Sequence, residues 1–211
     1  MKLLSVSVSL PREIRHAGKI VTTGIFKQPV RGPVHLGRCH LDGDGQADLV
    51  NHGGVDKAAY VYSAEDYAWW RRELEREDLP HGALGENLCI SGASDDSVRV
   101  GDVFRMGEAL VRVTQPRVPC FKLGIAMADA AFVKRFAGSR RTGFYVAVLE
   151  EGRVEAGDSV ARVARDPEGL TVRELFGLLV FREGGEDRVR QALCSESLSA
   201  AWRSELGALL P

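Results

Sequence analysis

Short runs in which apolar residues alternate with polar ones, or in which β-branched residues gather, recur along the first three quarters of the chain. They lie at residues 2–10, 19–26, 59–62, 98–105, 109–114 and 144–149. Runs of this length and period predict β-strands, and the 23 glycines of the chain supply turns. Met106-Gly107-Glu108 and Glu150-Glu151-Gly152 indicate hairpin connections. The pattern favours a mainly β fold, a closed or partly closed antiparallel barrel.

Helical spacing interrupts the strands in two places. A capping-box-like sequence begins at Ser63 and places Tyr67 and Trp70 on one helical face. A second helical run follows Cys120 and reaches Phe136. We therefore expect a few helices packed beside the predicted strands.

The pattern changes after Asp166-Pro167. Three helical runs follow, one after the capping box Thr171-Val172-Arg173-Glu174 and two more at residues 187–194 and 197–210. Gly184-Gly185 separates the first run from the second. We therefore predict a β domain at residues 1–166 and a small three-helix unit at residues 167–211.

Composition and charge exclude several classes of partner. The chain has 211 residues, of which 45% are apolar and 27% charged, and its formal net charge is −1, so no basic excess points to nucleic acid. The first ten residues lack the apolar core of a signal peptide, and no apolar run is long enough to cross a bilayer. We expect a cytoplasmic protein that binds neither a membrane nor nucleic acid.

One of the four cysteines has unusual surroundings. Cys120 follows a predicted strand and precedes a predicted helix, and Pro116 and Pro119 stiffen the loop between them. Arg117, Lys122 and the helix start bring positive charge, which favours thiolate over thiol. Cys120 is thus interpreted as a reactive or ligating thiol, and the alternative is a cysteine packed in a tight turn. The others suit packing, since no C-x-x-C pair occurs among Cys39, Cys89 and Cys194.

Several loops carry glycine, amide and cationic groups at predicted strand ends. The acidic loop at residues 42–48 lacks the glycine and the glutamate of an EF-hand, so we interpret it as a polar turn. Residues 51–57 combine amide, imidazole, carboxylate and ammonium groups around adjacent glycines, and residues 85–87 supply similar chemistry. Lys27 and Arg31 add two cations. Each loop alone is typical of a solvated turn, but together they suit an anionic ligand rich in heteroatoms.

In this order, the segments resemble the MOSC family, a domain also found at the carboxyl end of molybdenum-cofactor sulfurases. The resemblance spans residues 19 to 124, about half of the chain. Its motifs are Lys27-x-x-x-Arg31, Gly43-Asp44-Gly45-Gln46-Ala47-Asp48, Asn51-His52-Gly53-Gly54-x-Asp56-Lys57, Tyr62-Ser63-x-x-x-Tyr67-x-x-Trp70, Gly85-Glu86-Asn87-Leu88, Val100-Gly101-Asp102 and Gln115-Pro116-Arg117-x-Pro119-Cys120-x-Lys122-Leu123.

Within this family the chain is most similar to stand-alone bacterial members that are associated with resistance to 6-hydroxylaminopurine and carry a carboxyl-terminal three-helix domain. The resemblance implies a MOSC-type β-barrel that binds the molybdenum cofactor, molybdopterin, with Cys120 as the thiolate ligand of molybdenum. Lys27, Arg31 and Arg117 would neutralise the cofactor phosphate and charge that develops on oxygen. The further cofactor-binding residues that it implies are His52, Asp56, Lys57, Asn87, Gln115 and Arg117. Whether His52 or Asp56 relays protons stays open.

The resemblance also implies a reaction, the reductive dehydroxylation of N-hydroxylated compounds such as hydroxylamino-purines and amidoximes. No G-x-G-x-x-G fingerprint opens a helix after a strand, so the electrons are expected from a separate reductase. One alternative is a non-enzymatic carrier of molybdenum cofactor or sulfur through a Cys120 persulfide. Another is a redox-sensing thiol without a cofactor. The oligomeric state, for which a homodimer is the candidate, stays open.

Overall fold

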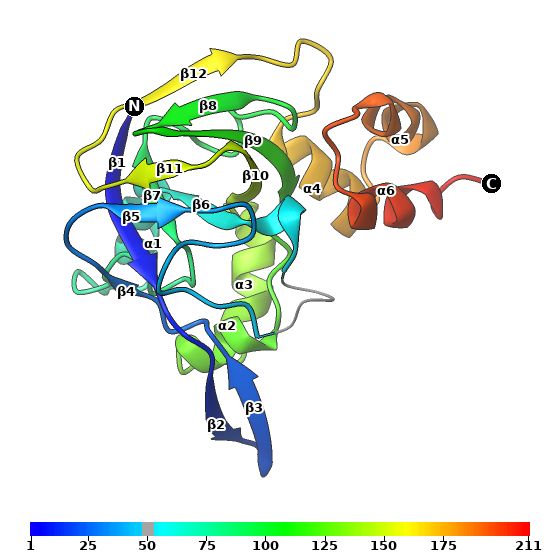
Figure 1. Cartoon of the computed structure of the whole chain (residues 1–211). Coiled ribbons are helices and arrows are strands. Elements are labelled where there is room, and N and C mark those ends of the chain that lie inside the picture. The colour runs from blue at the N-terminus through cyan, green and yellow to red at the C-terminus, as the bar shows by residue number, and fades with distance from the viewer. Residues whose placement is uncertain (48–52) are drawn as a thin grey trace.

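An eight-stranded sheet forms the body of the molecule in the computed structural model, which describes residues 1–47 and 53–211 (Figure 1). Its strand order is β12-β8-β9-β10-β6-β7-β1-β4. The strands are β1 Lys2–Val8, β4 Gln28–Pro29, β6 Ala59–Ser63, β7 Leu88–Ser91, β8 Val103–Met106, β9 Ala109–Pro116, β10 Phe144–Glu150 and β12 Val160–Ala164. Neighbouring strands are antiparallel except for β6 and β7, which run parallel. The prediction of a sheet-dominated fold is confirmed.

The predicted antiparallel barrel is not confirmed. Besides the parallel pair, β1 meets the segment before β12 only at its start, within the described part of the chain. Lys2 forms an isolated bridge with Ser159, and Leu3 N–H donates to Asp158 O over 3.0 Å. The sheet is therefore mixed and strongly curved, and no continuous strand pairing between β1 and β12 closes it among the described residues.

Two small antiparallel pairs complete the strands. β5 (Val34–Leu36) pairs with β11 (Gly152–Val154). The prediction of a hairpin between β10 and β11 is therefore wrong, because β11 pairs with β5 and not with β10. β2 (Arg12–His16) and β3 (Lys19–Thr23) form a hairpin that projects from the body (Figure 1). Its turn residues Ala17 and Gly18 both have positive φ, 46° and 76°, as a tight two-residue hairpin turn requires.

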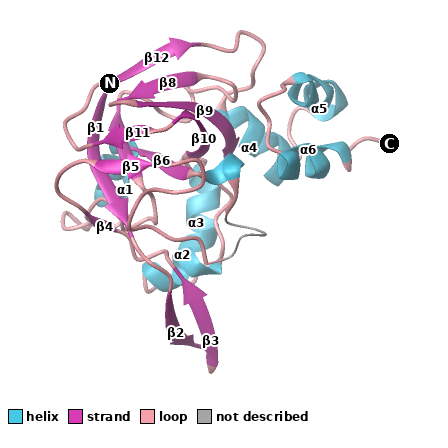
Figure 2. Ribbon diagram, viewed as in Figure 1, coloured by secondary structure: helices cyan, strands magenta, loops and turns pink. Residues whose placement is uncertain are grey.

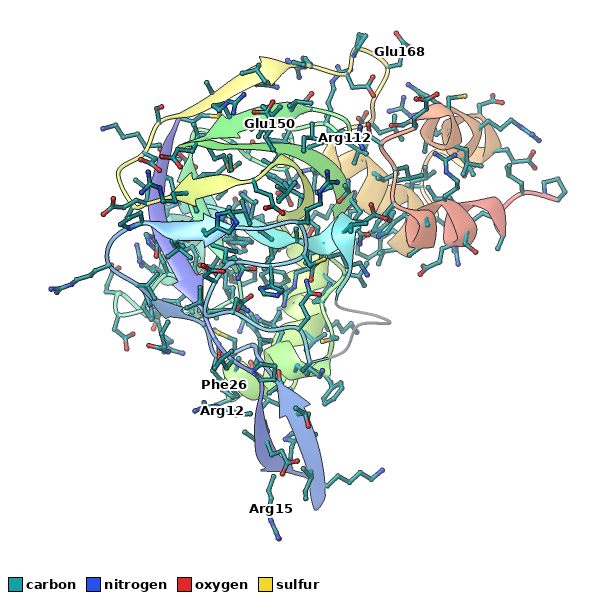
Figure 3. All side chains as sticks on the ribbon, in the orientation of Figure 1. Arg12, Arg15, Phe26, Arg112, Glu150 and Glu168 are labelled. Atoms are coloured by element: carbon teal, nitrogen blue, oxygen red, sulfur yellow. The ribbon has the colours of Figure 1, made fainter. Side chains whose placement is uncertain are left out.

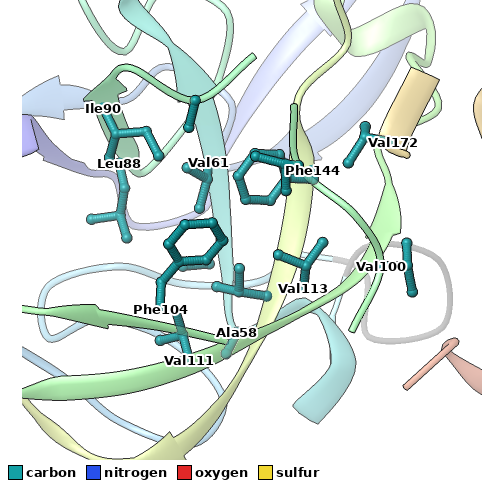
Figure 4. Packing of buried hydrophobic residues seen from close by; sticks show 14 of the residues in the cluster. Ala58, Val61, Leu88, Ile90, Val100, Phe104, Val111, Val113, Phe144 and Val172 are labelled. Atoms are coloured by element: carbon teal, nitrogen blue, oxygen red, sulfur yellow. The ribbon is translucent and has the colours of Figure 1, made fainter. Parts of the chain in front are cut away.

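The core lies between the curved walls of the sheet. Side chains such as Val61, Phe104, Val111 and Phe144 point toward one another from different strands (Figure 4). They alternate with more exposed residues along β8 and β9, which is the period-2 pattern that predicts these strands. Burial of this apolar surface is the main source of stability for the sheet.

Helices cover one side of the sheet (Figure 2). α1 (Ala64–Glu73), α2 (Phe121–Ala126) and α3 (Phe132–Ser139) pack with β6 around a second, aromatic cluster that includes Tyr62, Trp70 and Phe136. The aromatic rings pack against one another, and the rings of Trp70 and Phe136 are stacked with 5.6 Å between their centroids. The 3₁₀ helix η1 (Val55–Lys57) precedes β6. Because α2 starts directly after Cys120, this packing fixes where the thiol lies.

Three helices follow residue 166, namely α4 (Val172–Val180), α5 (Gly185–Cys194) and α6 (Ala200–Gly207). The capping box predicted at Thr171 and Glu174 is present in full. Val172, Leu175 and Trp202 are buried in the same hydrophobic cluster as the sheet residues. The helices thus share a core with the sheet. The predicted separate three-helix unit is therefore not confirmed. The domain boundary at residue 166 stays a prediction. None of the described helices is long and apolar enough to cross a membrane.

Candidate functional site

An open cavity lies where the end of β3, the segment before β4, the loop after β5 and the start of α2 meet. Its volume is about 100 Å³, and about 710 Å³ when the open mouth is included. A ligand can therefore place one end inside and leave the rest at the mouth. Lining residues that bear polar groups include Thr23, Lys27, Asp44, Gln46, Lys57, Tyr60, Asn87, Arg117, Cys120, Lys122 and Tyr145.

Cys120 is held at the edge of this cavity by the end of β9 and the start of α2. Its backbone is extended, with φ −121° and ψ 173°, and it is the N-cap residue of α2. The thiol is half-buried. Prolines on both sides of Arg117 and Val118 keep the preceding segment extended, as the sequence predicts. The half-buried position leaves the sulfur accessible from the cavity.

The loop before β10 positions Arg117. Arg117 N–H donates to Gly143 O over 3.0 Å, and Asp95 Oδ2 accepts from the N–H groups of Thr142 and Gly143 over 2.7 and 3.0 Å. Gly143 has φ 69°, and a Cβ there would lie 2.5 Å from Val61 O, so only glycine fits. Burial raises the pKa of Asp95 to about 7. This loop is rigid because a buried carboxyl group accepts both of its N–H groups.

Arg117 is a buried cation at the cavity wall, with 5% of its surface exposed. Its guanidinium carbon lies 4.7 Å from the centroid of the Tyr60 ring and 5.3 Å from that of Phe136, and Nη1 lies 3.4 Å from Tyr60 Oη. The ion pairs between described residues do not include it. Burial lowers the pKa of Arg117, but interactions with Tyr60, Tyr145 and Cys120 outweigh it and raise that pKa above its ordinary value. The guanidinium therefore stays charged and can attract an anion.

A second group of polar side chains, far from Cys120 in the sequence, also lines the cavity. Asp44 pairs with Lys27, accepts a 2.9 Å hydrogen bond from Asn87 Nδ2 and accepts a 2.8 Å hydrogen bond from Ser9 N–H. Asn87 Oδ1 in turn accepts from Tyr60 N–H over 3.1 Å. Burial lowers the pKa of Lys27, and the nearby Asp44 carboxylate offsets only part of that shift. Asp44 thus fixes the direction of both Lys27 and Asn87.

Glu86 lies beside this group and is fully buried. Its Oε1 accepts a 2.7 Å hydrogen bond from Tyr67 Oη of α1. Oε2 has no hydrogen-bond partner among the described residues. Burial raises the pKa of Glu86 to about 7, against smaller opposing contributions from Gly82 N–H and Tyr67. This carboxyl group can therefore hold or release a proton near neutral pH.

Five of the predicted site residues line the one cavity, namely Cys120, Lys27, Lys57, Asn87 and Arg117. Gln115 is buried on β9 opposite Tyr145, and its Oε1 finds no partner among the described residues. Arg31 is exposed and does not line the cavity. Asp56 points elsewhere, since its Oδ2 accepts from Ala200 N–H of α6 over 3.4 Å. His52 lies outside the described residues.

Asp44, Tyr60 and Tyr145 line the cavity but were not predicted as site residues. Asp44 lies in a glycine-rich acidic loop that the sequence explains equally well as a solvated turn. The two tyrosines occupy alternating positions of apolar strands, where packing is the simpler interpretation. Asp44 belongs to one of the motifs and Tyr60 lies between two of them, whereas Tyr145 lies beyond the last motif and reaches the cavity only because β10 pairs with β6 and β9.

Known proteins resemble this chain in sequence and in fold. A family model described as MOSC domain matches residues 48–161. The chain is 40% identical over 202 residues to the uncharacterized protein YflK of Bacillus subtilis (strain 168), covering 96% of this chain and 91% of YflK. It is 36% identical over 151 residues to a protein named Reductase from Gibberella moniliformis (strain M3125 / FGSC 7600), covering 70% of this chain and 27% of that longer protein.

Among solved structures, the crystal structure of YiiM from Geobacillus stearothermophilus superposes with a TM-score of 0.84 at 30% sequence identity, covering 100% of this chain and 99% of YiiM. The same fold therefore extends over the whole chain, including the helices after residue 166. Motifs, family model, relatives and structure agree, and the chain belongs to the MOSC family.

Proposed function

We propose that this protein is a molybdenum-cofactor-dependent reductase of N-hydroxylated compounds such as hydroxylamino-purines and amidoximes. The observation that carries the proposal is the pairing of a half-buried thiol, Cys120, with a buried guanidinium, Arg117, that has no carboxylate ion-pair partner among the described residues. Membership of the MOSC family and similarity to a protein named Reductase support it.

The residues at the cavity fit an anionic cofactor that brings its own metal ligands. Within the described residues no three His, Cys, Asp or Glu side chains gather to hold a metal ion, so a metal at Cys120 would take its other ligands from a cofactor. Thiolate is a soft ligand suited to such a metal. Among the described residues that line the cavity, Lys27, Lys57, Arg117 and Lys122 outnumber the carboxylate of Asp44. This excess of positive charge suits a phosphate-bearing ligand.

When bound, the cofactor supplies the two-electron chemistry that removes oxygen from an N–O bond and leaves the amine and water. Cys120 would hold the metal, and Arg117 and Lys57 would bind anionic groups beside it. Tyr60 and Tyr145 keep their protons because burial raises the pKa of each phenol. Tyr60 Oη already donates to Thr142 O over 2.6 Å, so of these two phenols it is Tyr145 that can donate a hydrogen bond to the substrate oxygen. Electrons would come from a separate reductase.

The decisive experiment measures metal content and activity together. Protein produced in cells that synthesise the pterin cofactor should contain nearly one molybdenum per chain and reduce 6-hydroxylaminopurine when reduced methyl viologen is supplied. Cys120→Ser should lose both the metal and the activity, because a hydroxyl is a poor soft-metal ligand. Cys194→Ser is the matched control, because Cys194 is exposed on α5, outside the cavity, and should change neither.

The outcomes separate the alternatives. Wild-type protein without molybdenum would contradict the cofactor proposal and favour a redox-sensing thiol. Protein that contains molybdenum but reduces none of the N-hydroxylated substrates would favour a carrier of cofactor or sulfur through a Cys120 persulfide. Mass spectrometry of the intact protein would then show an added sulfur atom on the wild type and not on Cys120→Ser.

A further inference from the structure

We propose that the β2–β3 hairpin and the start of α2 form a docking surface for an acidic electron-transfer flavoprotein. This inference rests on the proposed function, since it names the kind of partner that supplies the electrons. We define the docking surface by Arg15 and Lys19 of the hairpin and by Val118, Phe121 and Lys122 beside Cys120.

The hairpin connects the cavity with the outer surface. Thr23, at the end of β3, is buried and lines the cavity, whereas His16 and Lys19 flank the exposed turn. The His16 ring lies 6.4 Å from the Phe121 ring of α2, measured between centroids. Both rings line a cleft of about 550 Å³ together with residues of α2, α3 and the segment between them, among which is Asp129. A partner that contacts the hairpin is thereby brought next to Cys120, which directly precedes Phe121.

The charges of the docking surface favour an acidic partner. Arg15 extends away from the body at the hairpin, as Figure 3 shows, and Lys19 flanks the turn. Neither they nor Lys122 take part in any ion pair between described residues. Glu13 is the one acidic residue of the hairpin strands. Arg15 and Lys19 are exposed cations, and exposed cations attract a protein of opposite charge and speed its association.

Apolar side chains are exposed at the centre of the docking surface. Phe121 is 55% exposed and Val118 is 45% exposed, and both lie within two residues of Cys120. Exposed apolar side chains next to each other on a surface are typical of the core of a protein–protein interface. These apolar side chains favour a protein over duplex DNA, because a duplex would be bound mainly through its phosphates by the cations.

The electron balance defines the partner's chemistry. Reduction of one N-hydroxylated group to an amine and water consumes two electrons and two protons. A neutral flavin hydroquinone supplies both electrons and both protons as it is oxidised to the quinone. We therefore take a flavodoxin, kept reduced by its NADPH-dependent reductase, as the probe of the docking surface.

The experiment compares two electron donors on holoenzyme variants. With flavodoxin as the donor, the double variant Arg15→Glu/Lys19→Glu should reduce 6-hydroxylaminopurine with a kcat/KM for flavodoxin at least tenfold lower than that of the wild type. With reduced methyl viologen, which needs no docking, the same variant should stay within twofold of wild type. Direct binding of flavodoxin at low salt should weaken in parallel, and added salt should weaken wild-type binding more than binding to the variant.

Arg182→Glu/Arg190→Glu is the matched control, since it makes the same charge change at exposed positions in and beside the carboxyl-terminal helices. It should bind flavodoxin as the wild type does. If Arg15→Glu/Lys19→Glu fails to fold, Arg15→Ala/Lys19→Ala replaces it. We expect this neutral variant to lose flavodoxin binding and flavodoxin-dependent activity to an intermediate extent.

Three results would overturn the docking surface. Flavodoxin does not bind at low salt, the control weakens binding equally, or duplex DNA competes with flavodoxin for the hairpin. If methyl viologen supports no reduction by the wild type, the proposed function itself fails, which the viologen assay reveals independently of docking.

Discussion

Asp44 shows how one buried carboxylate can organise a cavity wall. It pairs with Lys27, accepts from Asn87 Nδ2 and accepts from Ser9 N–H, so four segments of the chain meet at its two oxygens. A buried charge pair of this kind contributes little net stability by itself, yet removing one partner leaves the other charge buried and unpaired. The structural role of Asp44 is therefore to hold the two cavity residues in position.

We expect Asp44→Ala to lower the free energy of unfolding by about 3 kcal/mol, as removal of one partner from a buried ion pair does. Urea titration followed by circular dichroism measures the change. Adding Lys27→Met to the variant should restore part of the loss, because the unpaired ammonium is then gone. Glu186→Ala is the control, since its ion pair with Arg190 is exposed and should be worth less than about 0.5 kcal/mol. Equal losses for both variants would contradict the role of Asp44.

Glu86 makes stability depend on pH. Its pKa is raised to about 7 in the folded protein by burial, from an ordinary value of 4.5. Between these two values the folded state binds the proton more tightly than the unfolded state, so the stabilising effect of protonation is complete below pH 4.5 and is lost as the pH rises to 7. Asp95, whose pKa is also raised to about 7 by burial, acts in the same direction.

We therefore expect Glu86→Gln to flatten the fall of the unfolding free energy between pH 5 and 7, by up to about 1.4 kcal/mol per pH unit. The amide stands in for the protonated carboxyl group and can still accept from Tyr67 Oη. Urea titrations at several pH values test this, with the exposed Glu186→Gln as control. A variant whose pH profile is parallel to that of the wild type would show that Glu86 does not titrate in this range.

At the scale of elements, local sequence patterns predict helices, and they predict strand pairs in which the two strands follow each other along the chain. The β8–β9 hairpin, α1 and the capped α4 lie close to where their apolar periodicity and caps place them. The pairing of β11 with β5 joins segments more than a hundred residues apart and has no local signal. The parallel pairing of β6 with β7 is likewise decided by the helix between them, which carries the chain back to the same end of the sheet.

The same limit applies to the site. Lys27, Asn87, Arg117 and Cys120 could be named from the sequence, because the motifs that contain them resemble those of the MOSC family. That Arg31 is exposed and Asp56 faces α6 depends on how β4 and η1 are oriented by the rest of the fold. Orientation of this kind comes from long-range packing, which residue spacing does not contain.

For the whole molecule, the relation between the sheet and the carboxyl-terminal helices decides how the protein unfolds. Val172 and Leu175 of α4 and Trp202 of α6 are almost completely buried, and they share one cluster with sheet residues such as Val113. Backbone hydrogen bonds tie the two parts together, from Val172 N–H to Val98 O over 2.9 Å and from Ser199 N–H to Thr114 O over 3.3 Å. We therefore expect the helices and the sheet to unfold together.

A protein that ends at residue 166 should consequently melt at least about 10 °C below the full chain, since loss of several buried apolar side chains costs several kcal/mol and each kcal/mol lowers the melting temperature by about 2–4 °C at this size. Differential scanning calorimetry should show a single transition for the full chain and a lower one for the shortened protein. Leu175→Ala in the full chain is the companion variant, and its cost of about 2–5 kcal/mol should lower the one transition without splitting it. Two transitions in the full chain, or an unchanged melting temperature after shortening, would instead show that the helices form a unit of their own beyond residue 166.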